Sequence, residues 1–277
     1  MVLVHGLGGS HANWLAVGPE LAAHARVVAP DLPGFGRTPL AGRSAHVRAQ
    51  VELFDRVLDT VADGPAVLVG NSMGGLIAMM EASERPQKVA GLVLVGPAQP
   101  RPLGSRIDPV VALTFAAYAF PGVGEQFLRW RAAWLGPERL VRQTLRFCCA
   151  DPARVPADVV AAHVALARER QRMSWAQPAF LEAARSILTV LSRSRDMQAM
   201  IQRITAPTLL VQGSEDRLVP LAASRALAAL RPDWQLAVFE GVGHVPQLEV
   251  PARFVATVSS WLDGALRPTG QAAYGRS

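Results

Sequence analysis

The sequence is poor in cysteine, and the two cysteines it contains are neighbours. Cys148 and Cys149 are the only ones among 277 residues. Adjacent cysteines cannot form the disulfide framework that holds small secreted domains together, and no metal-ligand spacing surrounds them. We therefore expect both cysteines to be structural and the protein to work in the reducing cytoplasm.

Long apolar runs are also missing, although half of the residues are hydrophobic. The longest run, residues 110–120, is far shorter than the ~20 residues of a membrane-spanning helix. The N-terminus has no charged leader with an apolar stretch and a cleavage site, so secretion is not indicated. At 277 residues the chain can bury a sizeable core, and we expect one soluble domain of catalytic size with room for an inserted subdomain.

Lysine is nearly absent, because Lys88 is the only lysine among 28 basic residues. The net charge is +6 at pH 7, and the excess lies in residues 101–203, which hold 15 arginines against 8 acidic residues. These arginines are scattered through helical patterns without interleaved aromatics or a nucleic-acid-binding motif. We expect no nucleic-acid partner, while attraction of an anionic substrate or an anionic membrane surface, as a peripheral lipid contact, is the functional alternative.

A glycine-flanked serine is the most informative feature present. Residues 66–69 are apolar and β-branched, as in a buried strand, and residues 76–82 continue with helix formers. Ser72 therefore falls in a tight turn from strand to helix, where side chains two positions away would collide and Gly70 and Gly74 fit. The pattern indicates a nucleophile elbow. Because Gly-x-Ser-x-Gly is common by chance, the alternative is an ordinary turn with an incidental serine.

Other segments alternate between strand and helix patterns. Apolar residues at helical spacing predict an amphipathic helix within residues 45–62. Strands are predicted at residues 2–4, 26–29, 66–69, 89–95, 208–211 and 236–239. Such alternation is typical of a mostly parallel sheet that is covered by helices on both faces, with its site at the carboxyl ends of the strands.

Polar motifs follow several of these strands. His5-Gly6-Leu7-Gly8-Gly9 follows the first strand, an acidic pair of Glu215 and Asp216 follows the strand at 208–211, and Gly243-His244 follows the last strand. Together with the serine turn, these motifs resemble the α/β-hydrolase fold superfamily in its serine-nucleophile branch. The chain order Ser72, Asp216, His244 is the order of that family.

This resemblance implies an α/β fold with a mostly parallel sheet flanked by helices and an inserted helical cap. It implies Ser72, Asp216 and His244 as the catalytic triad, with Glu215 as the local competitor for the acid. It also implies the backbone N–H groups of Leu7 and Met73 as the oxyanion hole. His5 and Asp31 match family positions that shape loops, and no metal or cofactor is implied.

The middle of the chain departs from the strand and helix rhythm. Residues 101–196 show proline-punctuated helical patterns and no convincing strand, so we expect them to form the cap, with residues 1–100 and 197–277 as a discontinuous core. Five aromatic residues of this part are candidates to line the substrate pocket, although each fits ordinary helix packing equally well. They are Tyr118, Trp130, Trp134, Trp175 and Phe180.

The N-terminus departs from the family pattern. Members carry one or two antiparallel strands before the strand that ends in His-Gly, whereas Met1 begins that strand here. We therefore expect these strands to be missing and the edge of the neighbouring strand to be uncovered.

The function that the resemblance implies is hydrolysis of a carboxylic ester of a small to medium, largely apolar molecule. The alternative is a carbon–carbon bond hydrolase of aromatic degradation, because residues 70–75 and 216–220 also resemble that branch. Cofactor-free perhydrolysis and a role as a small-molecule receptor complete the alternatives. A serine at the elbow argues against the family's epoxide hydrolases and haloalkane dehalogenases, which use aspartate there. The oligomeric state is left open.

Overall fold

Five short apolar strands form one parallel sheet in the computed structural model, which describes residues 1–102 and 104–265. Neighbours in the sheet follow chain order, and the strands are β1 (Val2–Val4), β2 (Ala66–Asn71), β3 (Val89–Val95), β4 (Thr208–Gly213) and β5 (Gln235–Phe239). Gly70 pairs with Val4 on one side and with Leu94 on the other, so the carboxyl ends of the first three strands lie at one edge. Polar residues that follow these strands therefore meet there.

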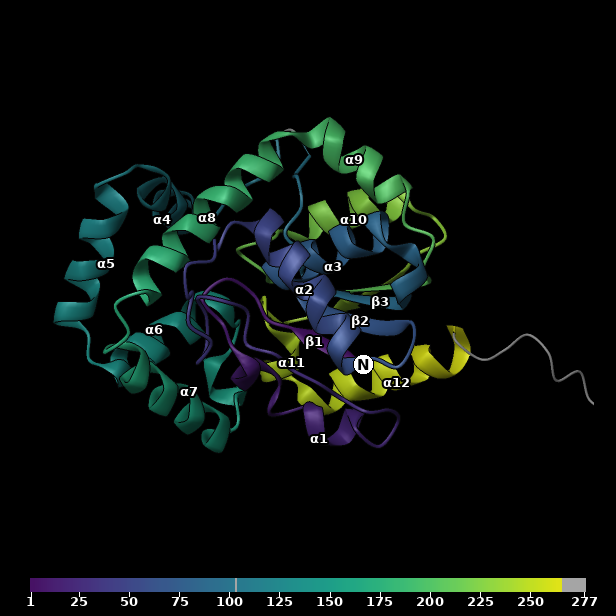
Figure 1. The fold of residues 1–277 in the computed structure, drawn as a ribbon, viewed down its shortest axis with the longest axis horizontal. Coiled ribbons are helices and arrows are strands. Elements are labelled where there is room, and N and C mark those ends of the chain that lie inside the picture. The colour runs from purple at the N-terminus through teal and green to yellow at the C-terminus, as the bar shows by residue number, and fades with distance from the viewer. Residues whose placement is uncertain (103, 266–277) are drawn as a thin grey trace, which may run out of the picture.

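Helices cover both faces of the sheet (Figure 1). One face packs against α2 (Val47–Val61), α3 (Met73–Glu84) and α10 (Leu221–Leu230), and the other against α1 (Gly18–Leu21) and α12 (Pro251–Ala265). This two-sided burial explains why the strands read as continuous apolar runs. Short elements complete this part of the fold, namely η1 (His11–Trp14), η2 (Pro86–Lys88) and α11 (Pro246–Glu249).

The amphipathic helix predicted within residues 45–62 is α2. Its side chains Val47, Val51, Phe54 and Leu58 recur at helical spacing and are buried. Burying a side chain the size of Phe54 or Leu58 contributes about 2 kcal/mol. The helix begins after His46, whose ring accepts a hydrogen bond from the Arg48 N–H. The spacing of the buried residues and the cap at His46 thus both indicate a helix that begins at Val47.

Between β3 and β4 the described residues form only helices and their connections. They are α4 (Pro109–Ala119), α5 (Val123–Trp134), α6 (Pro137–Cys148), η3 (Pro152–Arg154), α7 (Ala157–Arg170), α8 (Ala176–Ser192) and α9 (Ser194–Gln202). α4 and α6 begin at a proline, which suits the first helical position because its N–H would have no partner there. α4 and α5 pack on α8, α6 packs on α7, and α9 returns to α3 (Figure 1).

The strand predicted over residues 26–29 is wrong in extent. Only Val28 pairs with the sheet, through an isolated parallel bridge to Val2. Its N–H donates to the Met1 carbonyl at 3.0 Å, and its carbonyl accepts from the Leu3 N–H at 2.8 Å. The described residues contain no antiparallel strand, and this short segment covers part of the exposed edge of β1.

None of the helices in the described part of the chain has the length and apolar character needed to cross a membrane.

Candidate active site

Ser72 occupies a strained turn between β2 and α3. Its backbone has φ 55° and ψ −116°, in the left-handed half of conformational space that side chains disfavour. A Cβ atom on Gly70 would lie 2.4 Å from the Gly74 carbonyl oxygen, and one on Gly74 would lie 2.1 Å from the Val4 carbonyl oxygen. Only glycine fits at either position. The turn therefore has the geometry of a nucleophile elbow, and Ser72 is partly accessible within it.

Asp216 and His244 are in direct contact. The Oδ2 atom of Asp216 lies 2.7 Å from Nδ1 of His244, and both side chains are buried. An ionised carboxylate at this distance requires the proton on Nδ1, which leaves Nε2 as the acceptor. The competitor Glu215 is exposed, so the turn after β4 directs only Asp216 toward the histidine.

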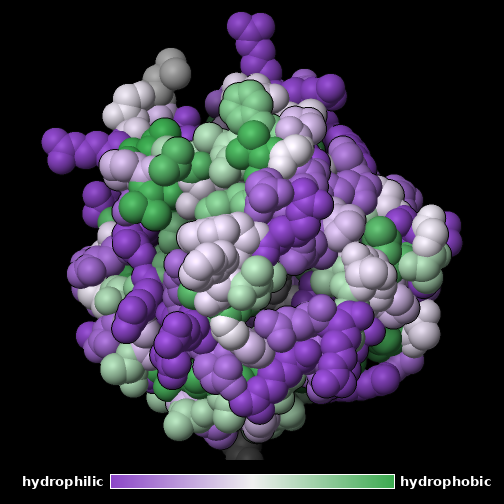
Figure 2. All heavy atoms as spheres, turned by 90° about the vertical axis from the view of Figure 1, so that its left-hand side faces the viewer, coloured by the Kyte–Doolittle hydropathy of each residue, from purple (hydrophilic) through white to green (hydrophobic). Residues whose placement is uncertain are grey.

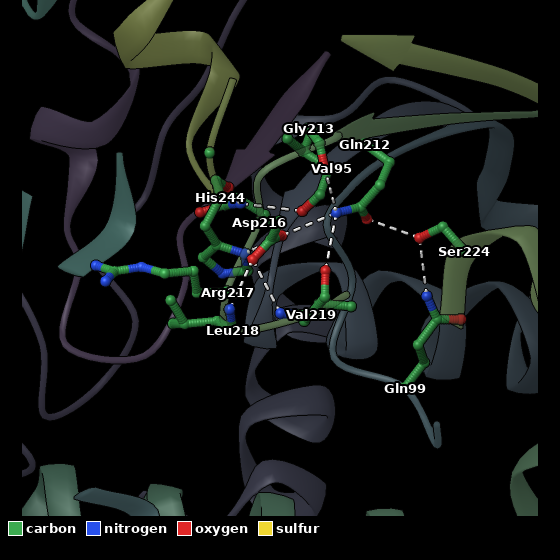
Figure 3. A network of polar contacts seen from close by, with 12 residues as sticks. Val95, Gln99, Gln212, Gly213, Asp216, Arg217, Leu218, Val219, Ser224 and His244 are labelled. Carbon is green, nitrogen blue, oxygen red and sulfur yellow. Dashed lines mark hydrogen bonds and ion pairs between the residues drawn. The ribbon is translucent and has the colours of Figure 1, made fainter. Parts of the chain in front are cut away.

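Every oxygen of the Asp216 carboxylate has donors (Figure 3). The Leu218 and Val219 N–H groups donate to Oδ1, each at 2.9 Å, and the Gln212 amide donates to Oδ2 at 2.9 Å. Gln212 is fully buried and also accepts from the Ser224 hydroxyl at 2.7 Å. Sequence reasoning missed Gln212. The available signal was a polar side chain near the end of an otherwise apolar strand.

A single side chain ties the serine turn to the histidine loop, which consists of residues 240–245 between β5 and α11. The Asn71 amide donates to the Val95 carbonyl at 2.9 Å and to the His244 carbonyl at 3.1 Å. Gly96 lies against both members of the pair, since a Cβ there would come within 3.0 Å of the Asp216 Oδ2 atom and 3.1 Å of the His244 Nδ1 atom. Ser72, Asp216 and His244 thus converge at the carboxyl edge of the sheet.

His244 Nε2 is buried and has no hydrogen-bond partner among the described residues, the Ser72 hydroxyl included. A buried acceptor without a partner is unfavourable unless it serves a function. Catalytic hydrogen bonds are often long without substrate and shorten in the complex. His244 Nε2 is therefore available to accept the proton of a serine hydroxyl.

Two backbone N–H groups next to Ser72 are free to bind an oxyanion. A Cβ on Gly6 would lie 3.2 Å from the Ser72 Cβ atom, so the Gly6-Leu7 turn runs directly beside the serine. Within residues 1–102 and 104–265, no hydrogen-bond acceptor is found for the Leu7 N–H or the Met73 N–H. Met73 also begins α3, whose N-terminus carries partial positive charge.

His5 and Asp31 shape the surrounding loops. The His5 ring is buried, lies 2.8 Å from the Gly6 carbonyl through Nδ1 and accepts from the Leu32 N–H at 3.1 Å through Nε2. Burial lowers the pKa of His5 to about 4, so the ring is neutral and both nitrogens are occupied. Burial alone would raise the pKa of Asp31, but hydrogen bonds from the His11 and Arg37 N–H groups hold it below its ordinary value.

Glu249 fixes the histidine loop to the helical insertion, the segment of α4 to α9 between β3 and β4, and sequence reasoning missed this residue. Its buried carboxylate accepts from the Gly243 N–H at 2.9 Å, the Asp151 N–H at 2.9 Å and the Ala150 N–H at 3.2 Å. The His244 N–H in turn donates to the Cys148 carbonyl at 2.6 Å. The position of the histidine therefore depends on the chain between α6 and η3.

A family model described as the alpha/beta hydrolase fold matches residues 1–251. The chain belongs to the α/β-hydrolase-fold family. This confirms the predicted fold and the resemblance on which it was based.

The relatives of this α/β-hydrolase include two kinds of hydrolase. It is 34% identical to a pimeloyl-[acyl-carrier protein] methyl ester esterase of Aromatoleum aromaticum, over 91% of this chain and 93% of the relative. It is 31% identical to a 2-hydroxy-6-oxo-2,4-heptadienoate hydrolase of Pseudomonas putida, over 95% of this chain and 88% of the relative. A solved 2-hydroxy-6-oxo-6-phenylhexa-2,4-dienoate hydrolase from Rhodococcus sp. strain RHA1 superposes with a TM-score of 0.72 at 26% identity, covering 95% of this chain and 89% of that one.

The five aromatic residues predicted to line the pocket lie in three different settings. Tyr118 and Phe180 stack edge to face with ring centroids 5.1 Å apart, and a Cβ on Gly8 would lie 3.0 Å from the Phe180 ring. Trp175 lies under the Arg170 guanidinium, at the start of α8. Trp130 and Trp134 are 55% and 71% exposed on α5. Phe180 and Tyr118 are thus placed beside Leu7 and Gly8, in the loop that follows β1 of this α/β-hydrolase.

The two cysteines of this α/β-hydrolase are not activated nucleophiles. Both thiols are free, and burial raises the pKa of Cys148 to about 12 and that of Cys149 well above its ordinary value. A thiol that stays protonated is a poor nucleophile and a poor metal ligand. In the described part of the chain, no cluster of three or more His, Cys, Asp or Glu side chains is arranged to hold a metal ion.

Proposed function

We propose that this chain is a serine hydrolase that cleaves carboxylic esters of small to medium, largely apolar molecules through an acyl-enzyme at Ser72. The observation that carries the proposal is the buried Asp216–His244 pair with its unpartnered Nε2 atom, tied by Asn71 to a strained serine turn. In this proposal residues 1–100 and 197–277 form the catalytic core, and residues 101–196 form the cap.

Ser72 is the nucleophile in this mechanism. Serine is a weak nucleophile at neutral pH, so His244 Nε2 accepts the hydroxyl proton while Oγ attacks the ester carbonyl carbon. Asp216 holds the proton on Nδ1 and stabilises the imidazolium that forms. The tetrahedral intermediate collapses to the acyl-enzyme, and the departing alcohol takes the proton from His244. Water then repeats these steps and releases the acid.

The Leu7 and Met73 N–H groups hold the developing oxyanion. They are fixed in place before substrate binds, so they need not reorganise during the reaction. The loss of one such donor typically raises the barrier by about 3 kcal/mol. An ordinary substitution cannot remove a backbone N–H group. The contribution of the Leu7 N–H is therefore tested by substituting the glycines that hold Leu7 beside the serine.

Two observations support an ester with an apolar group. The similar Aromatoleum aromaticum protein is named as a methyl ester esterase. The Leu7 side chain packs with Tyr118 and Phe180 in one apolar cluster beside residues 5–9, the oxyanion loop of this mechanism. Such a surface favours an apolar substituent near the reacting carbonyl, because its burial removes apolar area from water.

Carbon–carbon bond hydrolysis is the second candidate. It is favoured by the 31% identity to the heptadienoate hydrolase of Pseudomonas putida over nearly the whole chain. In that reaction the Ser72 oxygen adds to a ketone carbon, and the bond to a stabilised carbon leaving group breaks as that carbon takes the proton from His244. Water then hydrolyses the acyl-enzyme and releases the acid. Substrates of this class carry a carboxylate, which an arginine of the cap could bind.

A substrate series separates the two candidates. The folded protein is given p-nitrophenyl esters of increasing acyl length and, separately, a 2-hydroxy-6-oxo-dienoate, with Ser72→Ala protein as the blank. Ester turnover without loss of the dienoate absorbance supports the proposal, and the best acyl length measures the pocket. Dienoate cleavage without ester turnover supports the second candidate. Turnover of neither substrate by a folded protein contradicts both.

A further inference from the structure

The outer side of α4 and α5 exposes large apolar side chains. The α4–α5 face consists of Val110, Leu113, Phe120, Val123, Trp130 and Trp134, and the exposed fraction of each lies between 52% and 74%. Figure 2 views the side of the molecule that carries α4 to α7, where hydrophobic residues gather in the upper part among hydrophilic ones. Contiguous exposed apolar side chains are rare on a monomer and indicate a surface that is covered in use.

This exposure follows from the sequence of α4. Residues 109–119 contain no charged side chain, so the helix is apolar on all sides. Its inner side places Val111 and Tyr118 in the interior, and the opposite side, with Leu113 and Phe120, is left in solvent. A helix that is hydrophobic all round is normally buried. Here one side has no partner within the described chain.

The stretch of chain that carries this face, residues 101–150, also carries positive charge without ion-pair partners among the described residues. The three acidic residues of this part, Asp108, Glu125 and Glu138, are already paired with Arg217, Arg185 and Arg168. By contrast, six exposed arginines have no ion pair with any described residue, namely Arg101, Arg106, Arg129, Arg139, Arg142 and Arg146.

Three of these arginines form a row on α6. Arg139, Arg142 and Arg146 are spaced three and four residues apart, and so share one side of the helix, while Val141 and Leu145 are buried on the other. α6 lies beside α5, as the Arg131 guanidinium reaches the Thr144 hydroxyl at 3.3 Å. The basic row therefore lies on the helix that follows the α4–α5 face along the chain and touches α5.

We propose that the α4–α5 face and the unpaired arginines of residues 101–150 dock this protein on an anionic bilayer surface. Helices that lie in the headgroup region combine an apolar face carrying tryptophan, phenylalanine and leucine with neighbouring cationic side chains. Tryptophan is enriched at that boundary, where its ring is partly apolar and partly wet. Arginines without an ion-pair partner are attracted to anionic headgroups, which strengthens binding to the membrane surface.

A second copy of the chain fits this surface less well. A twofold interface brings the same patch of both subunits together, which sets the unpaired arginines of one copy near those of the other. Like charges at an interface oppose association. The positive charge of this surface therefore favours an anionic partner over a second copy of the chain.

Docking would bring lipid close to the serine. The Tyr118 ring, on the inner side of α4, lies 5.1 Å from that of Phe180, which in turn contacts the oxyanion loop at Gly8. The docking inference does not rest on the proposed function, because binding can be measured with Ser72→Ala protein. If the proposed function also holds, an ester dissolved in the bilayer would reach the site from this side.

Vesicle co-sedimentation tests the proposal. The full chain is mixed with vesicles of phosphatidylcholine alone or of equimolar phosphatidylcholine and phosphatidylglycerol, at low and high salt. We expect binding to the anionic vesicles that salt weakens. Arg139→Gln with Arg142→Gln should reduce partitioning by roughly fivefold for each arginine, and Leu113→Asn by on the order of tenfold. The matched controls Arg56→Gln and Leu15→Asn, exposed elsewhere on the molecule, should change nothing.

Fluorescence reports whether the apolar side enters the membrane. Brominated lipid should quench part of the tryptophan emission in wild type, and this quenching should be lost in a Trp130→Phe and Trp134→Phe protein that still sediments. Three results would overturn the proposal. They are no sedimentation with anionic vesicles, equal sedimentation with both vesicle types, and equal losses in the Arg56→Gln and Leu15→Asn controls. A lipid-free dimer that Leu113→Asn abolishes would assign the face to a second copy instead.

Discussion

Glu249→Gln should separate the histidine loop from the helical insertion. The carboxylate accepts three backbone N–H groups, from Gly243, Ala150 and Asp151, and its side chain is fully buried. Glutamine keeps the shape but replaces one acceptor oxygen with an NH₂ donor, which must then face at least one of these N–H groups. Losing one charge-assisted bond and leaving a buried donor unpaired costs about 2–4 kcal/mol. For a chain of this size that lowers Tm by roughly 5–10 °C.

Activity should fall as well, because Gly243 precedes the candidate base. A Cβ on Gly243 would lie 2.4 Å from the Cys148 carbonyl oxygen, so the loop and the chain after α6 are in close contact. A shift of the histidine by about 1 Å can cost on the order of 100-fold in rate. We expect kcat to fall by roughly 10- to 100-fold with KM nearly unchanged.

The assay combines thermal unfolding with ester kinetics on wild type, Glu249→Gln and Glu240→Gln. Glu240 is exposed and lies in the same connection after β5, so its variant controls for loss of a negative charge. Unchanged Tm and kcat in Glu249→Gln would refute the reasoning. A rise in KM alone would also refute it, since that would indicate a role in binding substrate rather than in positioning His244.

Three further predictions concern residues around the site and the core. Gln212→Leu should lower kcat by about tenfold, measured as ester turnover. The substitution removes one of the four hydrogen bonds to the Asp216 carboxylate and leaves the buried Ser224 hydroxyl without its acceptor. Gly74→Ala should abolish folding, seen by circular dichroism, since its methyl group would lie 2.1 Å from a β1 carbonyl oxygen, whereas Gly64→Ala, with no atom within 4 Å, should fold. Burial raises the pKa of Glu81 from 4.5 to about 7. Between these two pH values the folded state keeps a proton that the unfolded chain releases. The ionisation of Glu81 therefore lowers the free energy of unfolding as pH rises from 4.5 to about 7. Glu81→Gln should therefore gain stability relative to wild type across this window, by at most ~3 kcal/mol, in urea titrations. His5, with its pKa lowered to about 4, acts in the opposite sense and cancels in the difference.

The main elements could be predicted because their patterns are local. A parallel strand buried on both faces is a continuous apolar run, so β3 and β4 are evident without knowledge of their partners. The elbow is also local, because Gly70 and Gly74 are required by contacts within and next to one turn. The segment at residues 26–29 has the same apolar character, but only Val28 meets β1, and no local pattern fixes that extent.

Contacts between distant segments could not be predicted in the same way. Glu249 meets Ala150 and Asp151 across nearly a hundred residues, and nothing in its neighbourhood distinguishes it from a surface glutamate. Gln212 differs only because it is polar in an apolar strand. The exposure of Trp130 and Trp134 could not be predicted either, since an aromatic residue in a helix is normally packed against its neighbours.

Labelling with a fluorophosphonate, followed by peptide mapping, tests directly whether Ser72 is the nucleophile. We expect one adduct on folded wild type, at Ser72, none on Ser72→Ala, and much slower labelling of His244→Gln. Circular dichroism on each protein ensures that only folded chains are compared. A folded wild type that stays unlabelled, or a label on a different serine, would contradict the assignment of Ser72 as the nucleophile.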